Sequence, residues 1–434
     1  MDKRGIRVLR TSSLWETEPM YVLDQDRFVN GACEVETDLE PMELLDALQD
    51  IENTMGRYKV IDKGPRNIDL DILLYEDRKV DNERLKIPHI GIPEREFVLR
   101  PLAELIPYKP LYANKPWKLV QDYLNELPAN DALSPLTPLG SSLAPISSLK
   151  ATRKTHVMAI INVTPDSFSD GGVNTHTNLS ETACSAIASG ATILDIGGQS
   201  TAPGTPEISA AEEIARVVPS ITAIRALPCA QNVAISIDTY RAAVAEAAVA
   251  AGATIVNDVS AGTMDPAMLS TVARLGCTVC LMHMRGTPAT MQHRENCVYL
   301  DGVLSGVATG LSERVRAAQD AGIRRWRIML DPGLGFAKTP RQNLQLLAGL
   351  QELRAWQDLQ GLPWLVGASR KSFIGKATGT VEPRERVWGT AATVAAAVQG
   401  GADVVRVHDV RGMAQVARMS DWIWRLANDE KEML

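Results

Sequence analysis

The sequence has few of the features that mark membrane, secreted or nucleic-acid-binding proteins. No apolar run is long enough to span a bilayer, so we expect no membrane partner. The N-terminus lacks the apolar stretch of a signal peptide and shows no clear transit peptide, which predicts a cytoplasmic protein by default and leaves a mitochondrial one open. The formal net charge of −7 argues against a nucleic-acid partner.

Cysteine is scarce, with six residues in 434, and only Cys277 and Cys280 lie close together. A separation of three along a strand places two side chains on opposite faces, so we expect buried thiols in a reducing compartment rather than a metal or redox pair. No His/Cys cluster has zinc spacing, and no nucleophile elbow is present. The segment 367–372 lacks the glycine directly before lysine that a Walker A loop needs.

What the chain does contain divides into three regions, as its length also suggests. Residues 1–112 mix strand and helix patterns and predict a small α+β domain. Residues 113–153 predict a linker, because they lose periodicity and become rich in Pro and Ser. Residues 154–434 form the third region. In the first region we expect strands at 7–10, 28–37 and 67–75 and a helix at 41–55.

The third region repeats one pattern eight times: an Ala-rich helical stretch, an apolar β-branched run and a polar residue at its end. Runs that are apolar on both faces and alternate with helices are typical of buried parallel strands. Eight such units predict an α/β TIM barrel, with an open doubly wound sheet as the alternative. The runs end at Asn162, Asp195, Asp238, Asp258, His283, Asp331, Ser369 and His408.

Active sites of such barrels lie at the carboxyl ends of the strands, where this chain places many polar residues. Carboxylates and amides there suit a flat heterocycle rich in N–H and C=O groups, and basic residues suit a phosphate ester. Each strand-end Asp or Asn could instead only cap the next helix. Asn257 and Asp258 are adjacent, so at most one points inward. Arg406 and His408 are two apart and face the same way, as an anion clamp requires, or as a plain surface pair would.

Eight motifs in order, AIINVTPDSFSDGG, DIGGQST, SIDT, VNDVS, LMHM, DPGLGF, SRKS and RVHD, resemble dihydropteroate synthase. That resemblance implies condensation of 6-hydroxymethyl-7,8-dihydropterin diphosphate with 4-aminobenzoate, with Mg²⁺ as cofactor and a homodimer as the usual assembly. The implied pterin-binding residues are Asp238, Asn257, Asp331 and Lys371. Those for diphosphate and metal are Asn162, Arg406 and His408, and those for aminobenzoate are Thr201, Pro203, Phe336 and Ser372. The implied catalytic set is Asp195, Asp238, Lys371, Arg406 and His408.

Two loops of the resemblance stand out. The first, with Thr164 to Phe168 and the Gly171–Gly172 pair, is expected to fold over the substrates with the glycines as a hinge. The second has Ala202 where much of the family has an arginine able to contact the diphosphate.

The N-terminal region resembles 6-hydroxymethyl-7,8-dihydropterin pyrophosphokinase through GPRNIDLDILLY, IPH and REF. Asp69 and Asp71 lie two apart, so both can face one side and hold Mg²⁺ between ATP phosphates. The family's first strand and helix are missing here, so we expect an incomplete ferredoxin-like domain of uncertain kinase activity. The remaining implied residues of this kinase-like domain are Asn30, Arg57, Arg66, His89, Arg95 and Phe97.

The two activities are consecutive, as in fungal-type bifunctional or trifunctional folate synthesis proteins. No aldolase region of the kind that precedes the kinase in some relatives is visible. Two alternatives stay open: a pterin-dependent methyltransferase on a similar barrel, and a catalytically degenerate paralogue that only binds pterin.

Overall fold

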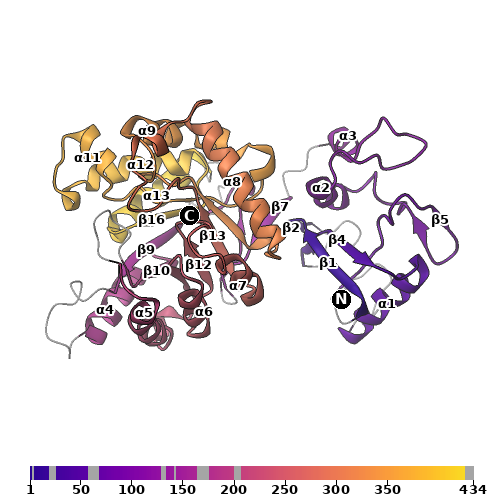
Figure 1. Cartoon of the computed structure of the whole chain (residues 1–434), viewed down its shortest axis with the longest axis horizontal. Helices are drawn as coiled ribbons and strands as arrows, with labels where there is room; N and C mark the ends of the chain where they lie inside the picture. Colours follow the sequence, from indigo (N-terminus) through magenta and orange to yellow (C-terminus); the bar gives the residue numbers. More distant parts are fainter. Residues whose placement is uncertain are drawn as a thin grey trace. The chain divides into compact units, whose positions relative to one another are not determined.

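A computed structural model describes residues 1, 4–18, 26–56, 68–128, 133–140, 143–163, 175–199 and 207–425. The chain divides into two compact units, Met1–Leu136 and Thr137–Leu434, each with its own hydrophobic core (Figure 1). No helix in these described ranges is long and apolar enough to cross a membrane.

The second unit is an eight-stranded parallel barrel, as the repeated pattern predicts. Its strands follow the order β14-β13-β12-β11-β10-β9-β16-β15, and a parallel bridge between Leu330 and Trp364 closes β14 against β15. All eight predicted runs form strands. They are β9 (His156–Asn162), β10 (Ile193–Gly197), β11 (Ala234–Asp238), β12 (Ile255–Asp258), β13 (Thr278–Met282), β14 (Ile328–Asp331), β15 (Leu365–Val366) and β16 (Val404–Val407).

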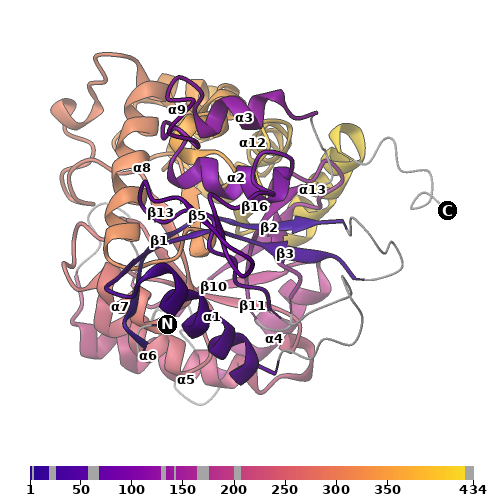
Figure 2. The same cartoon turned by 90° about the vertical axis from the view of Figure 1, so that its right-hand side faces the viewer.

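Helices surround this barrel on the outside, as Figures 1 and 2 both show. Val, Ile, Leu and Ala side chains of the strands and helices interlock there in one large apolar core. The helices are α4 (Thr175–Ala188), α5 (Ala210–Arg225), α6 (Ala242–Ala250), α7 (Met268–Leu275), α8 (Val303–Asp320), α9 (Pro340–Ala348), α10 (Leu350–Arg354), α11 (Ser372–Thr378), α12 (Val387–Gln399) and α13 (Val410–Trp424).

The barrel interior is closed at its lower end by an apolar floor. One buried side chain from each strand contributes, and Leu139 and Ile146 of the preceding segment join them. The Thr254 hydroxyl donates to the Leu139 carbonyl and holds that segment in place. The floor residues of the strands are Met158, Ile193, Ala234, Ile255, Cys280, Met329, Leu365 and Val404. Cys280 thus points inward while Cys277 packs in the outer core, which confirms that the two thiols face opposite ways.

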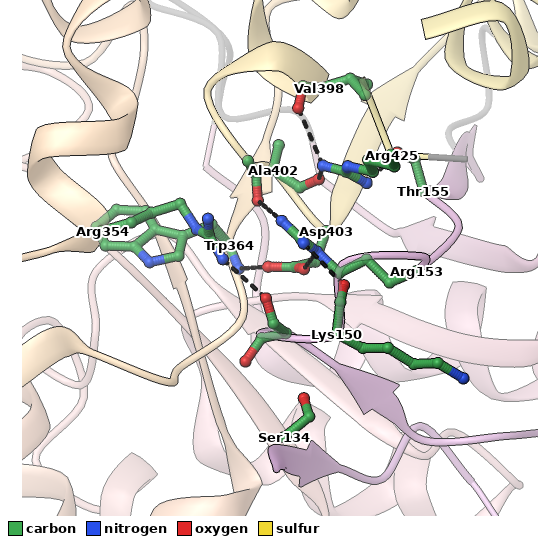
Figure 3. Close-up of polar contacts among 12 residues, drawn as sticks. Ser134, Lys150, Arg153, Thr155, Arg354, Trp364, Val398, Ala402, Asp403 and Arg425 are labelled. Carbon is green, nitrogen blue, oxygen red and sulfur yellow. Dashed lines mark hydrogen bonds and ion pairs between the residues drawn. The ribbon is translucent and has the colours of Figure 1, made fainter. Parts of the chain in front are cut away.

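A buried charged cluster ties the start of the barrel to its last strand and helix (Figure 3). Asp403, which is 1% exposed, accepts from Arg153 Nε at 2.9 Å and from the Trp364 amide at 2.9 Å. Asp421 accepts from both the amide and the hydroxyl of Thr155 at 2.7 Å. The Arg153–Asp403 and Thr155–Asp421 contacts each join residues more than 200 positions apart in the sequence.

The first unit is a small α+β unit. The β1 strand pairs antiparallel with β4, and β2 pairs antiparallel with both β3 and β7. Figure 2 shows α2 and α3 lying side by side. The elements are β1 (Ile6–Thr11), β2 (Leu14–Thr17), β3 (Phe28–Asn30), β4 (Cys33–Thr37), α1 (Pro41–Thr54), β5 (Val80–Asp81), β6 (Lys86–Ile87), α2 (Glu96–Leu105), α3 (Val120–Glu126) and β7 (Ser134–Thr137).

Two expectations for this unit change. The single strand expected at 28–37 is broken at Gly31 and Ala32 into β3 and β4, which pair with different partners. The strand expected at 67–75 is wrong over its described part, because 68–75 belongs to no sheet. Its inward and outward alternation survives, but the Leu70 amide is bonded to the Glu52 carboxylate instead of to a neighbouring strand.

Short structured elements also occupy the stretch 113–153 expected as a linker. They are α3, β7 and β8 (Ile146–Ser147), and Leu139 between them is fully buried in the barrel floor.

Candidate active site

A polar layer lies directly above the apolar floor of the barrel. Along a strand, side chains two positions apart lie on the same face. The residue two positions after each floor residue therefore also points into the barrel. This places Asp195, Asn257 and Arg406 together, on β10, β12 and β16. The Asn257 amide donates to Asp195 Oδ2 at 3.1 Å, and Arg406 Nε donates to the same oxygen at 2.6 Å. Asp238, two residues beyond the buried Ser236, accepts from Arg406 Nη2 at 2.6 Å.

Two carboxylate oxygens in this layer have no hydrogen-bond partner among the residues that the structure describes. They are Oδ1 of Asp195 and Oδ1 of Asp238, both buried. Because buried polar atoms in native proteins are nearly always hydrogen-bonded, these oxygens are suited to N–H donors of a bound molecule. Burial raises the pKa of Asp238 to about 7, against the opposing effect of Arg406.

A third carboxylate, that of Asp331, interacts electrostatically with the ammonium of Lys371. Asp331 Oδ1 accepts from the Gly333 amide at 2.7 Å, and burial raises the pKa of Asp331, an effect that Lys371 opposes. Lys371 donates to the Leu334 carbonyl and lies 4.7 Å above the Phe336 ring. Burial lowers the pKa of Lys371 to about 8. An aromatic ring, a cation and a carboxylate therefore converge here.

Asn162 and His408 lie at the carboxyl ends of β9 and β16. Asn162 is exposed, and its Oδ1 lies above Gly197, 3.3 Å from where a Cβ would stand. The His408 Nδ1 is 3.0 Å from the Ser369 hydroxyl, whose oxygen also accepts from the His408 amide. Burial lowers the pKa of His408 to about 4, so at neutral pH the imidazole is an uncharged hydrogen-bonding group rather than a cation.

Phe336 packs with Tyr240, Val259 and Met282 in a small apolar cluster beside the polar layer. Ser372 opens α11 and is exposed. Thr201, Pro203 and the first loop from Thr164 lie outside the described residues, as does Ala202.

Several strand-end residues face away from this site. The Asp258 carboxylate accepts from Ser260 and Gly262, as a loop cap does, so Asn257 is the inward member of that pair. His283 follows the inward Met282 and packs outward against Gly310 of α8. Arg370 pairs with Asp409 at 2.7 Å.

Sequence reasoning missed Lys338, which is 3% exposed and reaches both the 332–338 loop and His283. It also missed Arg241, which binds Gln199 Oε1 at 2.8 Å and Glu207 Oε1 at 3.0 Å. From the sequence, a lysine after Gly-Leu-Gly-Phe would be expected to be solvent-exposed, because a loop has no periodicity that shows which of its residues are buried. For Arg241, the two glutamates at 207 and 213 were the available signal.

In the first unit, two of the expected residues, Arg95 and Phe97, lie together at the start of α2. The Arg95 guanidinium lies 5.9 Å from the Phe97 ring, and the His89 amide donates to Leu73 at 2.9 Å. Asp69 and Asp71 are both exposed and alternate with less exposed neighbours, which places them on one side of the segment. Asn30 donates to the Thr17 hydroxyl at 2.8 Å. Arg57 and Arg66 lie outside the described residues.

Comparison with known proteins matches residues 158–408 to the family described as pterin binding enzyme. The chain therefore belongs to the pterin-binding enzyme family. Residues 1–107 match 7,8-dihydro-6-hydroxymethylpterin-pyrophosphokinase as a second family, so the chain joins two folate-synthesis domains.

Relatives with both domains cover nearly the whole chain. The folic acid synthesis protein fol1 of Schizosaccharomyces pombe is 48% identical over 96% of this chain, which spans 55% of that relative's length. The mitochondrial folate synthesis bifunctional protein of Arabidopsis thaliana is 41% identical over 98% of this chain and 79% of its own. The crystal structure of dihydropteroate synthase from Clostridium difficile, determined in the presence of pteroic acid, matches 63% of this chain and 98% of its own, with a TM-score of 0.57 and 39% identity.

Proposed function

We propose that the second unit condenses 6-hydroxymethyl-7,8-dihydropterin diphosphate with 4-aminobenzoate, giving 7,8-dihydropteroate and diphosphate. The observation that carries this proposal is the pair of unpartnered carboxylate oxygens of Asp195 and Asp238 above an apolar floor. A pterin ring offers N–H donors for such oxygens, and its flat faces suit the Met and Phe side chains beside them. The presence of pteroic acid with the C. difficile synthase, a molecule made of both substrate halves, agrees with this.

The pterin edge is assigned to Asp238, Asn257, Asp331 and Lys371. Asp238 and Asp331 accept its N–H groups, and Lys371 donates to its carbonyl. The raised pKa of both carboxyls shows how strongly the site disfavours charge there without a partner. A bound ring that donates hydrogen bonds favours the ionised form, so binding and ionisation support each other.

The diphosphate is assigned to Asn162, Arg406 and His408. Among the described residues no group of three His, Cys, Asp or Glu side chains could hold a metal. The site therefore fits a Mg²⁺ held mainly by the substrate's phosphates and water, with the Asn162 carboxamide as its protein ligand. Such an ion would offset charge that develops on the leaving diphosphate. Uncharged His408 would donate a hydrogen bond to a phosphate oxygen.

The aminobenzoate is assigned to Phe336 and Ser372, together with Thr201 and Pro203 of the second loop. Its ring would stack near Phe336 and its carboxylate would meet the first residues of α11, whose backbone N–H groups can donate hydrogen bonds to an anion.

We propose a dissociative displacement. As diphosphate departs, positive charge spreads from the pterin methylene into the ring, and the carboxylates of Asp238 and Asp195 stabilise it. The arylamine then attacks without a strong general base. In a quench assay with labelled pterin diphosphate, Asp238→Ala should lose the trapped cation-like state, and unchanged turnover would rule out this role.

For the first unit, residues 1–112, we propose a second activity: ATP-dependent pyrophosphorylation of 6-hydroxymethyl-7,8-dihydropterin. Asp69 and Asp71 would hold Mg²⁺ on ATP, Arg57, Arg66, His89 and Arg95 would meet phosphates, and Asn30 and Phe97 would contact the pterin. A cavity of about 460 Å³ lies between β4 and residues 70–74, lined by Leu44, Leu48 and Leu102.

We also propose a homodimer and a synthase domain that includes residues 154–434 together with the floor residues Leu139 and Ile146 of the stretch expected as a linker. The exposed Trp388 and Val381 near α12 would suit a subunit interface. The chain would be cytoplasmic by default, or mitochondrial as the names of two plant relatives state for those proteins.

The test is diphosphate release by the whole chain with both substrates, compared with either alone. Release only with both supports the synthase, whereas pterin binding without release would favour the degenerate paralogue. The kinase is assayed separately as ATP-dependent formation of pterin diphosphate.

A further inference from the structure

The loop between β14 and α9 is held by side chains that bond its successive carbonyls. Five consecutive carbonyls, 334 to 338, each accept from a different side chain. The loop carries Asp331 before it and Phe336 within it. The donors, in order of the carbonyl they bond, are Lys371, Gln292, Lys338, Tyr299 and Asn343.

Lys338 is the central member of this set because it bonds two segments at once. Its Nζ lies 2.9 Å from the Phe336 carbonyl, 3.0 Å from His283 Nδ1 and 3.3 Å from the His283 carbonyl. An ammonium has three N–H donors, and all three have an acceptor here. The pKa of His283 is well below its usual range because the ring is buried, so Nδ1 is free to accept.

The loop is pressed tightly against His283 at this point. A Cβ on Gly333 would lie 2.0 Å from the His283 carbonyl oxygen, and Gly333 has φ +69°. Ala337 is fully buried and also has a positive φ, +50°, which is uncommon for any residue other than glycine. The backbone around Phe336 is therefore strained, and it needs outside contacts to keep its shape.

A buried cation is costly unless hydrogen bonds compensate for its lost hydration. The Lys338 ammonium has these compensating hydrogen bonds only while the loop keeps its present position, because its three acceptors belong to Phe336 and His283. The Phe336 ring in turn lies under the Lys371 ammonium at 4.7 Å. Movement of the Phe336 backbone would thus shift the ring relative to the Lys371 ammonium, which is bonded to the Leu334 carbonyl.

We propose that Lys338 is a positioning residue for the acceptor half of the site: by tying the Phe336 carbonyl to His283, it sets where the Phe336 ring stands. This rests on the proposed condensation, in which Phe336 contacts 4-aminobenzoate. Asp331 is held by hydrogen bonds that do not use the Lys338 side chain: those of the β13–β14 ladder, in which the His283 amide donates to the Asp331 carbonyl, and that of the Gly333 amide. Loss of Lys338 should therefore disturb aminobenzoate more than pterin.

The test is Lys338→Met, which keeps the length of the side chain and removes all three donors. We expect the KM for 4-aminobenzoate to rise about tenfold, while the KM for pterin diphosphate stays within about twofold. Lys376→Met, at an exposed lysine of α11, is the matched control and should change neither. Lys338→Gln restores two N–H donors without charge and should recover part of the loss; it also serves if Lys338→Met does not fold.

A lowered melting temperature with both KM values unchanged would overturn the proposal, because Lys338 would then be only structural. Equal rises in both KM values would overturn it as well. The wild-type chain is measured alongside. If the wild-type chain releases no diphosphate, the condensation itself is refuted and the role of Lys338 falls with it. If the wild-type chain does release diphosphate, the KM values of Lys338→Met alone test the role of Lys338.

Discussion

The guanidinium of Arg406 bridges two carboxylates, with its Nε 2.6 Å from Asp195 Oδ2 and its Nη2 2.6 Å from Asp238 Oδ2. The other oxygen of each carboxylate is buried and has no hydrogen-bond partner in the described part of the chain. Arg406 therefore organises the acceptors that the site presents, in addition to any contact with phosphate. A residue expected as an anion clamp already has two anions as partners.

Replacing Asp238 by Asn should lower kcat/KM by roughly 10²-fold, because a buried charge-assisted hydrogen bond contributes about 1.5–3 kcal/mol. Steady-state kinetics with both substrates measure this, and binding of a pterin by calorimetry should weaken in parallel. Asp320→Asn, at an exposed residue near the end of α8, is the control. Unchanged pterin binding in Asp238→Asn would remove Asp238 from the pterin set.

The same carboxyl should make stability depend on pH. Its folded-state pKa, about 7, is above the ordinary value for Asp, so the folded state binds more protons between these two values. The corresponding stabilisation is present below about pH 4 and is lost as pH rises to about 7. Urea unfolding of the ligand-free chain at several pH values should show this slope, and Asp238→Asn should flatten it.

His408 should act in the opposite direction. Burial and the nearby Arg370 and Arg406 lower its folded-state pKa to about 4, so the unfolded state binds the proton more readily. Stability is then lost as pH falls from about 6.5 toward 4, and His408→Gln should remove that loss. His293→Gln is the control, since its side chain is 58% exposed. Identical acid profiles for wild type and His408→Gln would contradict the burial of His408 as the cause.

Asp403 should be essential to the stability of the barrel (Figure 3). Asp403→Ala removes the partner of Arg153 and of the Trp364 amide and leaves both buried without it. We expect a loss of about 3–5 kcal/mol in the free energy of unfolding, as for other broken buried pairs. Denaturant unfolding of the whole chain measures this, with Asp320→Ala as the exposed control. A loss under about 1 kcal/mol would mean that water replaces the missing carboxylate.

Restoring arginine at position 202 should lower the apparent KM for pterin diphosphate, if that side chain contacts the diphosphate as in much of the family. Initial rates over a range of pterin diphosphate test Ala202→Arg, with Ala202→Gln as the uncharged control. Equal KM values in all three chains would mean that Asn162, Arg406 and His408 manage the diphosphate without it.

The barrel could be predicted from the sequence because all eight strands are buried on both faces, which leaves a repeated apolar run for each one. Which of Asn257 and Asp258 points inward could not be predicted, because a run that is apolar on both faces shows no alternation. The hydrogen bond between Asn257 and Asp195 shows that it is Asn257. The roles given to the site residues stay predictions.

Other features depend on partners that a sequence does not reveal. Residues 68–75 have strand composition but no neighbouring strand in the described chain, so they form none. His283 ends an apolar run like the other site residues, yet it falls on the outer face. Lys338 gave no signal, because its burial comes from a folded loop and from α9 rather than from a local pattern.

The floor of the barrel gives the short segment before β9 a larger importance than its composition suggests. Leu139 and Ile146 stop the cylinder from below, so a synthase fragment that begins at residue 154 would open to water beneath the polar layer. A cut that separates the two domains, made with a protease or by dividing the gene, should therefore lie upstream of residue 137. The segment that joins the two domains is thus partly buried inside the barrel of the second one.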